Sequence, residues 1–238
     1  SDVTPTASEI INSRADTTRW KQFLNKKSIE NVEKLFAASP SDYHKMSPAE
    51  LFVFLNRYYS QEICLKIDGS NGGTLDNYIQ ELAENKKMKV VGLESTLDQI
   101  KLINKDVEGM PRRVHQKRLN SMIKLIQSKS TANCNLVDWY QSMEIDYKIS
   151  QECGNTLVLT SRNNKWSELL IPKLKSTNCF IAVGLSHLMY ECGLLNQLKE
   201  AGFNITAAAV TGPARQPRPA SSVPHSRLKP EKFSLSIK

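Results

Sequence analysis

Two polar side chains, Glu94 and His187, follow short apolar segments of the chain at the points where those segments end. Glu94 comes directly after Met88–Leu93, and His187 lies three residues beyond Gly184, the last residue of Asn178–Gly184. In an open α/β sheet, side chains at the carboxyl ends of parallel strands converge on one rim. A carboxylate and an imidazole on the same rim can bind a divalent metal ion or act as an acid–base pair. Both residues can also serve as helix caps or surface groups, and the two alternatives stay open here.

The pattern around these residues predicts strands that alternate with helices. Met88–Leu93 and Asn178–Gly184 are predicted as buried strands and Phe203–Ala208 as a shorter third strand. Helices are predicted to begin at Ser95 and to run over residues 186–201. Such alternation is typical of an α/β domain. We therefore expect an α/β fold with a mixed, mainly parallel sheet flanked by helices, and with a largely helical insertion.

Capping signals mark the remaining helices. Ser47, Pro48 and Glu50 combine a capping hydroxyl, a first-turn proline and a carboxylate that can bond back to the cap. Apolar residues at spacings of three and four predict two helices within residues 8–39. Further helices are predicted over residues 48–60, 74–82, 111–130 and 136–143.

The composition indicates a folded protein. The chain has 238 residues, of which 40% are hydrophobic and 24% charged, close to the averages of globular proteins. Its 10 glycines and 10 prolines exclude collagen-like, elastic and wholly disordered classes. We expect one large domain over residues 1–211. No apolar run is long enough to span a membrane, and the first residues lack the features of a signal peptide. Because the chain begins at Ser1 rather than at Met, we expect it to be a processed or trimmed piece of a longer product.

A basic, proline-rich tail is predicted over residues 212–238. It holds six Lys or Arg residues and one Glu, a large part of the net charge of +8. Elsewhere the basic residues alternate with acidic ones, so no nucleic acid partner is expected. The tail is predicted to add little to the core, with Phe233–Ile237 as an added edge strand as the alternative.

The five cysteines cannot all pair within one chain, and none forms a Cys-x-x-Cys motif. Cys179 and Cys192 are predicted as buried free thiols. Cys134 and Cys153 flank a predicted helix and could form a disulfide in an extracytoplasmic protein.

Four ordered stretches resemble the TraB/GumN family, the bacterial relatives of the animal Tiki proteins. They are Gly73–Asp76, Lys89–Glu94 with Gln99, Ser161–Asn163 with Trp166, and Ile181–Leu188. The resemblance covers residues from about Ser28 to Thr211. It implies a divalent-metal-dependent hydrolase of the peptidase type, related in fold to erythromycin-esterase-like and ChaN-like proteins. It also implies a peptide or protein substrate and favours an extracytoplasmic location.

The family pattern has two Gly-x-x-His motifs with a Leu-Glu carboxylate between them. Gly184–His187 matches the second motif and Glu94 the carboxylate, so the resemblance implies these two residues as metal ligands, for a metal of unknown identity. No other histidine has a glycine three residues before it, and we expect the first motif to lie upstream of Ser1. Its loss would instead make the chain a binding-only relative. With two of three usual ligands, the chain alone is predicted to bind metal weakly and to lack appreciable peptidase activity.

Arg162 and Asn163 complete the set that the resemblance implies. Arg162 could hold a carboxylate in a bidentate fork, and Asn163 could orient it. The structural alternative is that Arg162 forms an ion pair and Asn163 caps the following helix. Asp76 is interpreted as a first-turn residue that the helix dipole favours.

Overall fold

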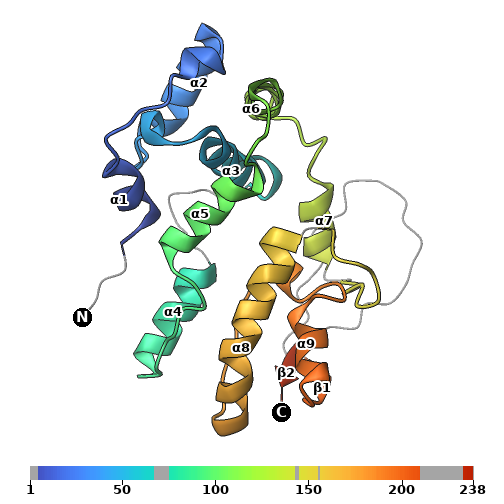
Figure 1. The fold of residues 1–238 in the computed structure, drawn as a ribbon. Helices are drawn as coiled ribbons and strands as arrows, with labels where there is room; N and C mark the ends of the chain where they lie inside the picture. Colours follow the sequence, from blue (N-terminus) through green and yellow to red (C-terminus); the bar gives the residue numbers. More distant parts are fainter. Residues whose placement is uncertain (1–4, 67–74, 143–144, 155, 210–232, 238) are drawn as a thin grey trace. The chain divides into compact units, whose positions relative to one another are not determined.

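The computed structural model of the protein describes residues 5–66, 75–142, 145–154, 156–209 and 233–237 (Figure 1). It divides the chain into two compact units, Ser1–Val137 and Asp138–Lys238. In the part of the chain that is described, no helix is both long and apolar enough to cross a lipid bilayer.

The helices of the first unit begin where the capping residues predict. Ser47 and Glu50 form a reciprocal capping box with Pro48 in the first turn, and Ser95 accepts a bond from the Asp98 amide. The helices of this unit are α1 (Ala7–Asn12), η1 (Trp20–Gln22), α2 (Lys26–Phe36), η2 (Tyr43–Lys45), α3 (Pro48–Tyr58), η3 (Tyr59–Cys64), α4 (Leu75–Asn85), α5 (Thr96–Asp106) and α6 (Arg112–Gln127); α7 (Asn135–Ser142) spans the boundary between the units.

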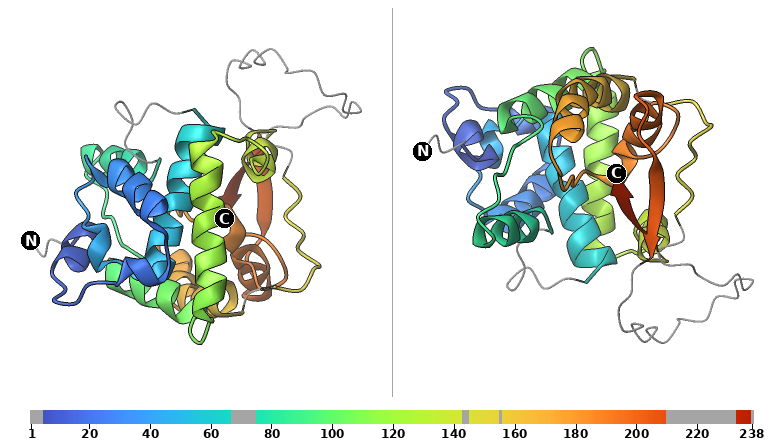
Figure 2. Two further views of the ribbon diagram at one scale, coloured as in Figure 1. Left: turned by 90° about the horizontal axis from the view of Figure 1, so that it is seen from above. Right: turned by 90° about the horizontal axis from the view of Figure 1, so that it is seen from below.

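The core of the first unit forms where α3 and α6 lie side by side (Figure 2). Leu51 and Leu55 of α3 and Leu119 of α6 have no exposed surface, and Val32 of α2 joins the same cluster. Burial of each such side chain contributes roughly 2 kcal/mol. Apolar residues at helical spacing therefore account for the arrangement of these three helices.

The second unit packs α8 (Ser161–Ser176) against α9 (Leu194–Glu200). Trp166 and Leu170 of α8 are buried, as are Leu194 and Leu198 of α9. The other elements are η4 (Thr156–Thr160), η5 (Leu185–His187), β1 (Ile205–Ala209) and β2 (Phe233–Ile237). The strands pair antiparallel, with Ile205 opposite Ile237 and Ala209 opposite Phe233. The strand predicted over Phe203–Ala208 is thus present as β1.

The predicted mixed, mainly parallel sheet is wrong. Met88–Leu93 and Asn178–Gly184 run as irregular chain, and the only sheet in the described residues is the β1–β2 pair. Val90 is 50% exposed and Phe180 73%, so neither run is a buried strand. An apolar run indicates that a segment could be a strand, but a strand forms only where a partner supplies the ladder of hydrogen bonds.

The helix predicted over residues 186–201 is also interrupted. It divides into η5 and α9 because Tyr190 adopts a φ of 68°, outside the helical region. At Gly193, a Cβ atom would collide with the carbonyl oxygens of Leu188 and Met189. Glycine at this position thus permits the close turn that leads into α9.

Of the predicted tail, residues 212–232 and 238 lie outside the described residues. The described part of the tail, Phe233–Ile237, is β2, which pairs with β1. The alternative prediction, that Phe233–Ile237 forms an added edge strand, is therefore confirmed.

Two disulfides differ from the predicted cysteine states. Cys64 bonds to Cys134, and Cys153 bonds to Cys192, with Cα–Cα distances of 5.4 and 6.0 Å. The suggested Cys134–Cys153 pair and the free thiol at Cys192 are therefore wrong, and Cys179 is free but exposed. Pairing depends on which Cα atoms the fold brings within about 7 Å, and spacing along the chain does not encode this.

Candidate functional site

The side chain of His187 is held by Asn163 in the interior of the second unit. His187 ends η5, which begins directly after Gly184, and its amide donates to the Gly184 carbonyl at 2.9 Å. Asn163 lies in the first turn of α8 and is completely buried, and His187 is 6% exposed. The ring Nδ1 of His187 and Oδ1 of Asn163 are 2.7 Å apart. The structure therefore brings together two of the residues predicted from the sequence.

The bonds of the Asn163 amide determine which ring nitrogen of His187 carries the proton. Nδ2 of Asn163 donates to the carbonyl oxygens of His187, at 3.3 Å, and of Cys192, at 2.8 Å. Since Nδ2 of Asn163 faces two carbonyl acceptors, Oδ1 of Asn163 must be the atom that faces Nδ1 of His187. An amide oxygen can only accept a hydrogen bond, so Nδ1 of His187 must carry a proton. The neutral ring then has its lone pair on Nε2. This is the tautomer of a histidine that binds a metal through Nε2.

Arg162 and Trp166 extend the cluster along α8. The Trp166 ring lies 4.4 Å from the His187 ring, and the Arg162 guanidinium lies 4.7 Å from the Trp166 ring. Both α8 residues are four apart, so they share one helix face. The structural alternative, in which Asn163 caps this helix, is wrong, because Asn163 lies inside α8 and bonds to the His187 loop.

Trp166 also brings an unpaired donor into this cluster. The ring is 4% exposed, and its Nε1 has no hydrogen-bond partner among the described residues. A buried donor without a partner costs about 1–3 kcal/mol.

Glu94 belongs to the first unit. It is half-buried and directly precedes Ser95, the cap of α5. The sheet edge that was predicted to bring Glu94 and His187 together is not formed, so that argument for a shared site is lost. Asp76 is an exposed residue in the first turn of α4, as predicted.

His187 fits the role of one metal ligand, because its Nδ1 is anchored and its lone pair is on Nε2. Catalytic zinc sites usually take three protein ligands. Within the described residues, no three His, Cys, Asp or Glu side chains gather closely enough to hold an ion. His187 alone would therefore not complete a metal site.

Sequence reasoning missed the Cys153–Cys192 disulfide beside this cluster. Cys192 lies five residues after His187, and its carbonyl is one of the two acceptors that orient Asn163. The short distance along the chain from His187 to Cys192 was a signal that the cysteine could matter, but nothing in the sequence identified Cys153 as its partner.

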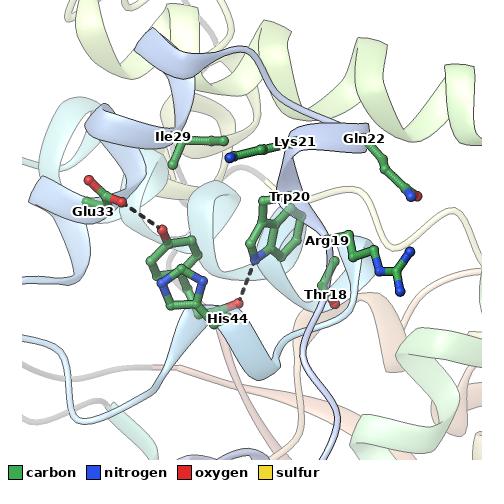
Figure 3. A pocket seen from close by; sticks show the side chains of 9 residues that line it. Thr18, Arg19, Trp20, Lys21, Gln22, Ile29, Glu33 and His44 are labelled. Atoms are coloured by element: carbon green, nitrogen blue, oxygen red, sulfur yellow. Dashed lines mark hydrogen bonds between the residues drawn. The ribbon is translucent and has the colours of Figure 1, made fainter.

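A pocket of about 530 Å³ lies in the first unit, beside Trp20 and Glu33 (Figure 3). The Trp20 indole donates to the Tyr43 carbonyl at 3.1 Å, and the Tyr43 hydroxyl donates to Glu33 at 3.3 Å. Burial, with the charge of Glu33, raises the pKa of Tyr43 to about 12. The His44 ring packs on Tyr43 at 4.1 Å. Trp20, Tyr43 and Glu33 are thus bonded to one another in the pocket wall.

The comparisons with known proteins agree with the motifs around this cluster. The family model for the TraB/PrgY/gumN family matches residues 6–207, a span that includes Glu94, Arg162, Asn163 and His187. No curated protein and no solved structure matches the chain significantly. The family model covers most of the 238 residues, and the chain therefore belongs to the TraB/PrgY/gumN family.

Proposed function

We propose that this chain takes part in metal-dependent hydrolysis of the peptidase type, with His187 as a metal ligand. The observation that carries the proposal is the buried contact of 2.7 Å between Asn163 and His187, which leaves the lone pair on Nε2. Membership of the family and the Gly184–His187 motif support the same role. The chemistry that a divalent ion supplies in such a site is polarisation of a carbonyl group and activation of water.

The other residues have roles that follow from their chemistry. Glu94 is proposed as a second ligand or the general base only because it matches the Leu-Glu carboxylate of the family pattern. Asn163 is a positioning residue, because it acts through the His187 ring. Arg162 is placed by its packing on Trp166 and would hold a carboxylate of the substrate.

Peptide cleavage in the presence of Zn²⁺, Co²⁺ or Mn²⁺ tests the proposal. The complete gene product is compared with its His187→Ala and Glu94→Ala variants, and His115→Ala is the control for loss of a histidine. We expect each of the first two substitutions to lower kcat/KM by about 100-fold or more, since each removes a group from the reacting centre. The control should retain full activity.

Activity that survives both substitutions would exclude the proposed site. The absence of cleavage with any of the metals would favour the second candidate function.

The second candidate is a non-catalytic protein that binds a partner, and the surface of α4 favours it. Leu75, Tyr78 and Leu82 are 64%, 61% and 44% exposed and recur at helical spacing on one face. Their substitution by serine would weaken partner binding, and no metal would give cleavage by the unsubstituted protein.

An oxidising, extracytoplasmic compartment is part of the proposal. Two disulfides join four of the five cysteines, and disulfides persist in secreted and periplasmic proteins. Alkylation of the protein taken directly from cells should modify Cys179 alone.

A further inference from the structure

The loop that follows His187 is bonded to a separate segment, residues 147–153, which we call the strap. The amide of Tyr190 donates to the Tyr147 carbonyl at 2.9 Å, and the amide of Glu191 donates to the Gln151 carbonyl at 3.0 Å. Asn196, in α9, donates to the Ile149 carbonyl at 2.6 Å. These bonds align the strap with the loop over its whole length.

The Cys153–Cys192 disulfide joins the end of the strap to the end of the loop. The amide of Cys192 also donates to the sulfur of Cys153 at 3.2 Å. The carbonyl of Cys192 accepts bonds from Asn163 at 2.8 Å and from Gln197 at 3.0 Å. The disulfide therefore fixes the position of the carbonyl that faces the Asn163 amide.

The position of this carbonyl controls the orientation of Asn163. If the amide turned over, Oδ1 would face the carbonyls of His187 and Cys192. The His187 carbonyl would lose its bond from Asn163, and the Cys192 carbonyl would keep only the bond from Gln197. Each buried acceptor left unpaired costs about 1–3 kcal/mol. The turned amide would present its NH₂ group to Nδ1 of His187. That group needs an acceptor, so the proton of the ring would move to Nε2 and occupy the lone pair that a metal requires.

We propose that the Cys153–Cys192 disulfide is a positioning element for His187: it holds the Cys192 carbonyl, the carbonyl orients the Asn163 amide, and the amide keeps the proton on Nδ1. The significance of this for catalysis rests on the proposed function, but the tautomer of His187 does not. Both cysteines are half-buried rather than buried, so a reductant can reach them. A dithiol that reduces the bond gives up two electrons and two protons, closes into its own disulfide and leaves Cys153 and Cys192 as thiols.

The test is nitrogen NMR of the His187 ring in the full chain, without metal. The wild type is compared with the Cys153→Ser, Cys192→Ser double variant, and Cys179→Ser is the control for loss of an exposed cysteine in the same unit. We expect the wild type and the control to have the proton on Nδ1. In the double variant, the ratio of the two tautomers should shift toward Nε2–H by about tenfold or more, since about 1.4 kcal/mol of bonding to the amide is lost.

A second double variant, Cys153→Ala with Cys192→Val, refills the volume of the disulfide with apolar atoms and should show the same shift. A proton that stays on Nδ1 in either folded variant would overturn the proposal. Unfolding of the second unit in both variants would overturn the proposal as well. The disulfide would then be required for the fold of the whole unit rather than for the position of the loop that follows His187.

Zn²⁺ affinity separates this proposal from the proposed function. Loss of a group that orients a metal-binding histidine typically lowers metal affinity 10-fold to 100-fold, and we expect such a loss in both double variants. If the wild type binds no Zn²⁺ but the tautomer shifts as described, the proposed function fails and the positioning role stands.

Discussion

Replacement of Arg14 by alanine should lower the free energy of unfolding by about 3 kcal/mol, because it leaves a buried carboxylate without its charge partner. The Glu50 side chain is 4% exposed, and Arg14 donates to its two oxygens at 2.7 and 2.9 Å. The amides of Ser47 and Asn104 donate to the same carboxylate at 2.8 and 2.6 Å. Arg14 is 30% exposed, so water compensates in part, and the lower end of the range for buried pairs applies.

This carboxylate should also make stability depend on pH below neutrality. Burial alone would raise the pKa of Glu50, but the bonds from Arg14, Ser47 and Asn104 and the charge of Arg14 outweigh burial, and the net pKa is lowered. A carboxyl group with a lowered pKa in the folded state contributes stability above its unfolded pKa of about 4.3. That contribution is lost as the pH falls from there through the folded pKa. The loss should be smaller in Arg14→Ala.

Chemical denaturation at several pH values between neutrality and pH 3 measures both effects. Arg57→Ala is the matched control, because Arg57 is an exposed residue of α3, and its replacement should change stability by less than about 0.5 kcal/mol. The explanation fails if Arg14→Ala costs no more than the control. It also fails if the variant keeps the full loss of stability at acid pH.

Removal of the Cys64–Cys134 disulfide should lower the stability of the first unit by about 4 kcal/mol. The bond joins residues 70 apart, and in the chain-entropy model a loop of this length restricts the unfolded chain by about that amount. Noncovalent bonds of the Tyr59 hydroxyl remain between these segments: it donates to the Ser130 carbonyl at 2.7 Å and accepts from the Asn133 amide at 3.3 Å.

The measurement is denaturant unfolding of Cys64→Ala, Cys134→Ala, followed by circular dichroism. Cys179→Ala is the control, since that thiol is exposed and free. A loss below about 1 kcal/mol would show that the unfolded first unit is already compact where the disulfide would restrict it.

Local signals were sufficient to predict most helices and insufficient to predict the sheet. The caps at Ser47 and Ser95 act within one turn of their own helices, so the sequence contains everything that they need. A strand at Met88–Leu93 or Asn178–Gly184 depends on a partner elsewhere in the chain, and the apolar pattern does not show whether one is present.

The same distinction applies to the candidate site. Asn163 and His187 were selected by their motifs, and the structure places them in contact. The pairing of Cys153 with Cys192 could not be predicted, because it depends on how the strap folds against the His187 loop. Arg162 and Trp166 lie at a spacing of four in a helix, so their contact could have been predicted from the sequence.

The most direct test of the central claim is a Zn²⁺ titration of the chain followed at the two ring nitrogens of His187. Before metal is added, the proton should be on Nδ1, as the 2.7 Å contact with Asn163 requires. As Zn²⁺ is added, the Nε2 signal should move while Nδ1 keeps its proton, with weak affinity because other ligands are needed. A proton on Nε2 at the start, or an Nε2 signal that does not respond to excess Zn²⁺, would contradict the role of His187 as a metal ligand.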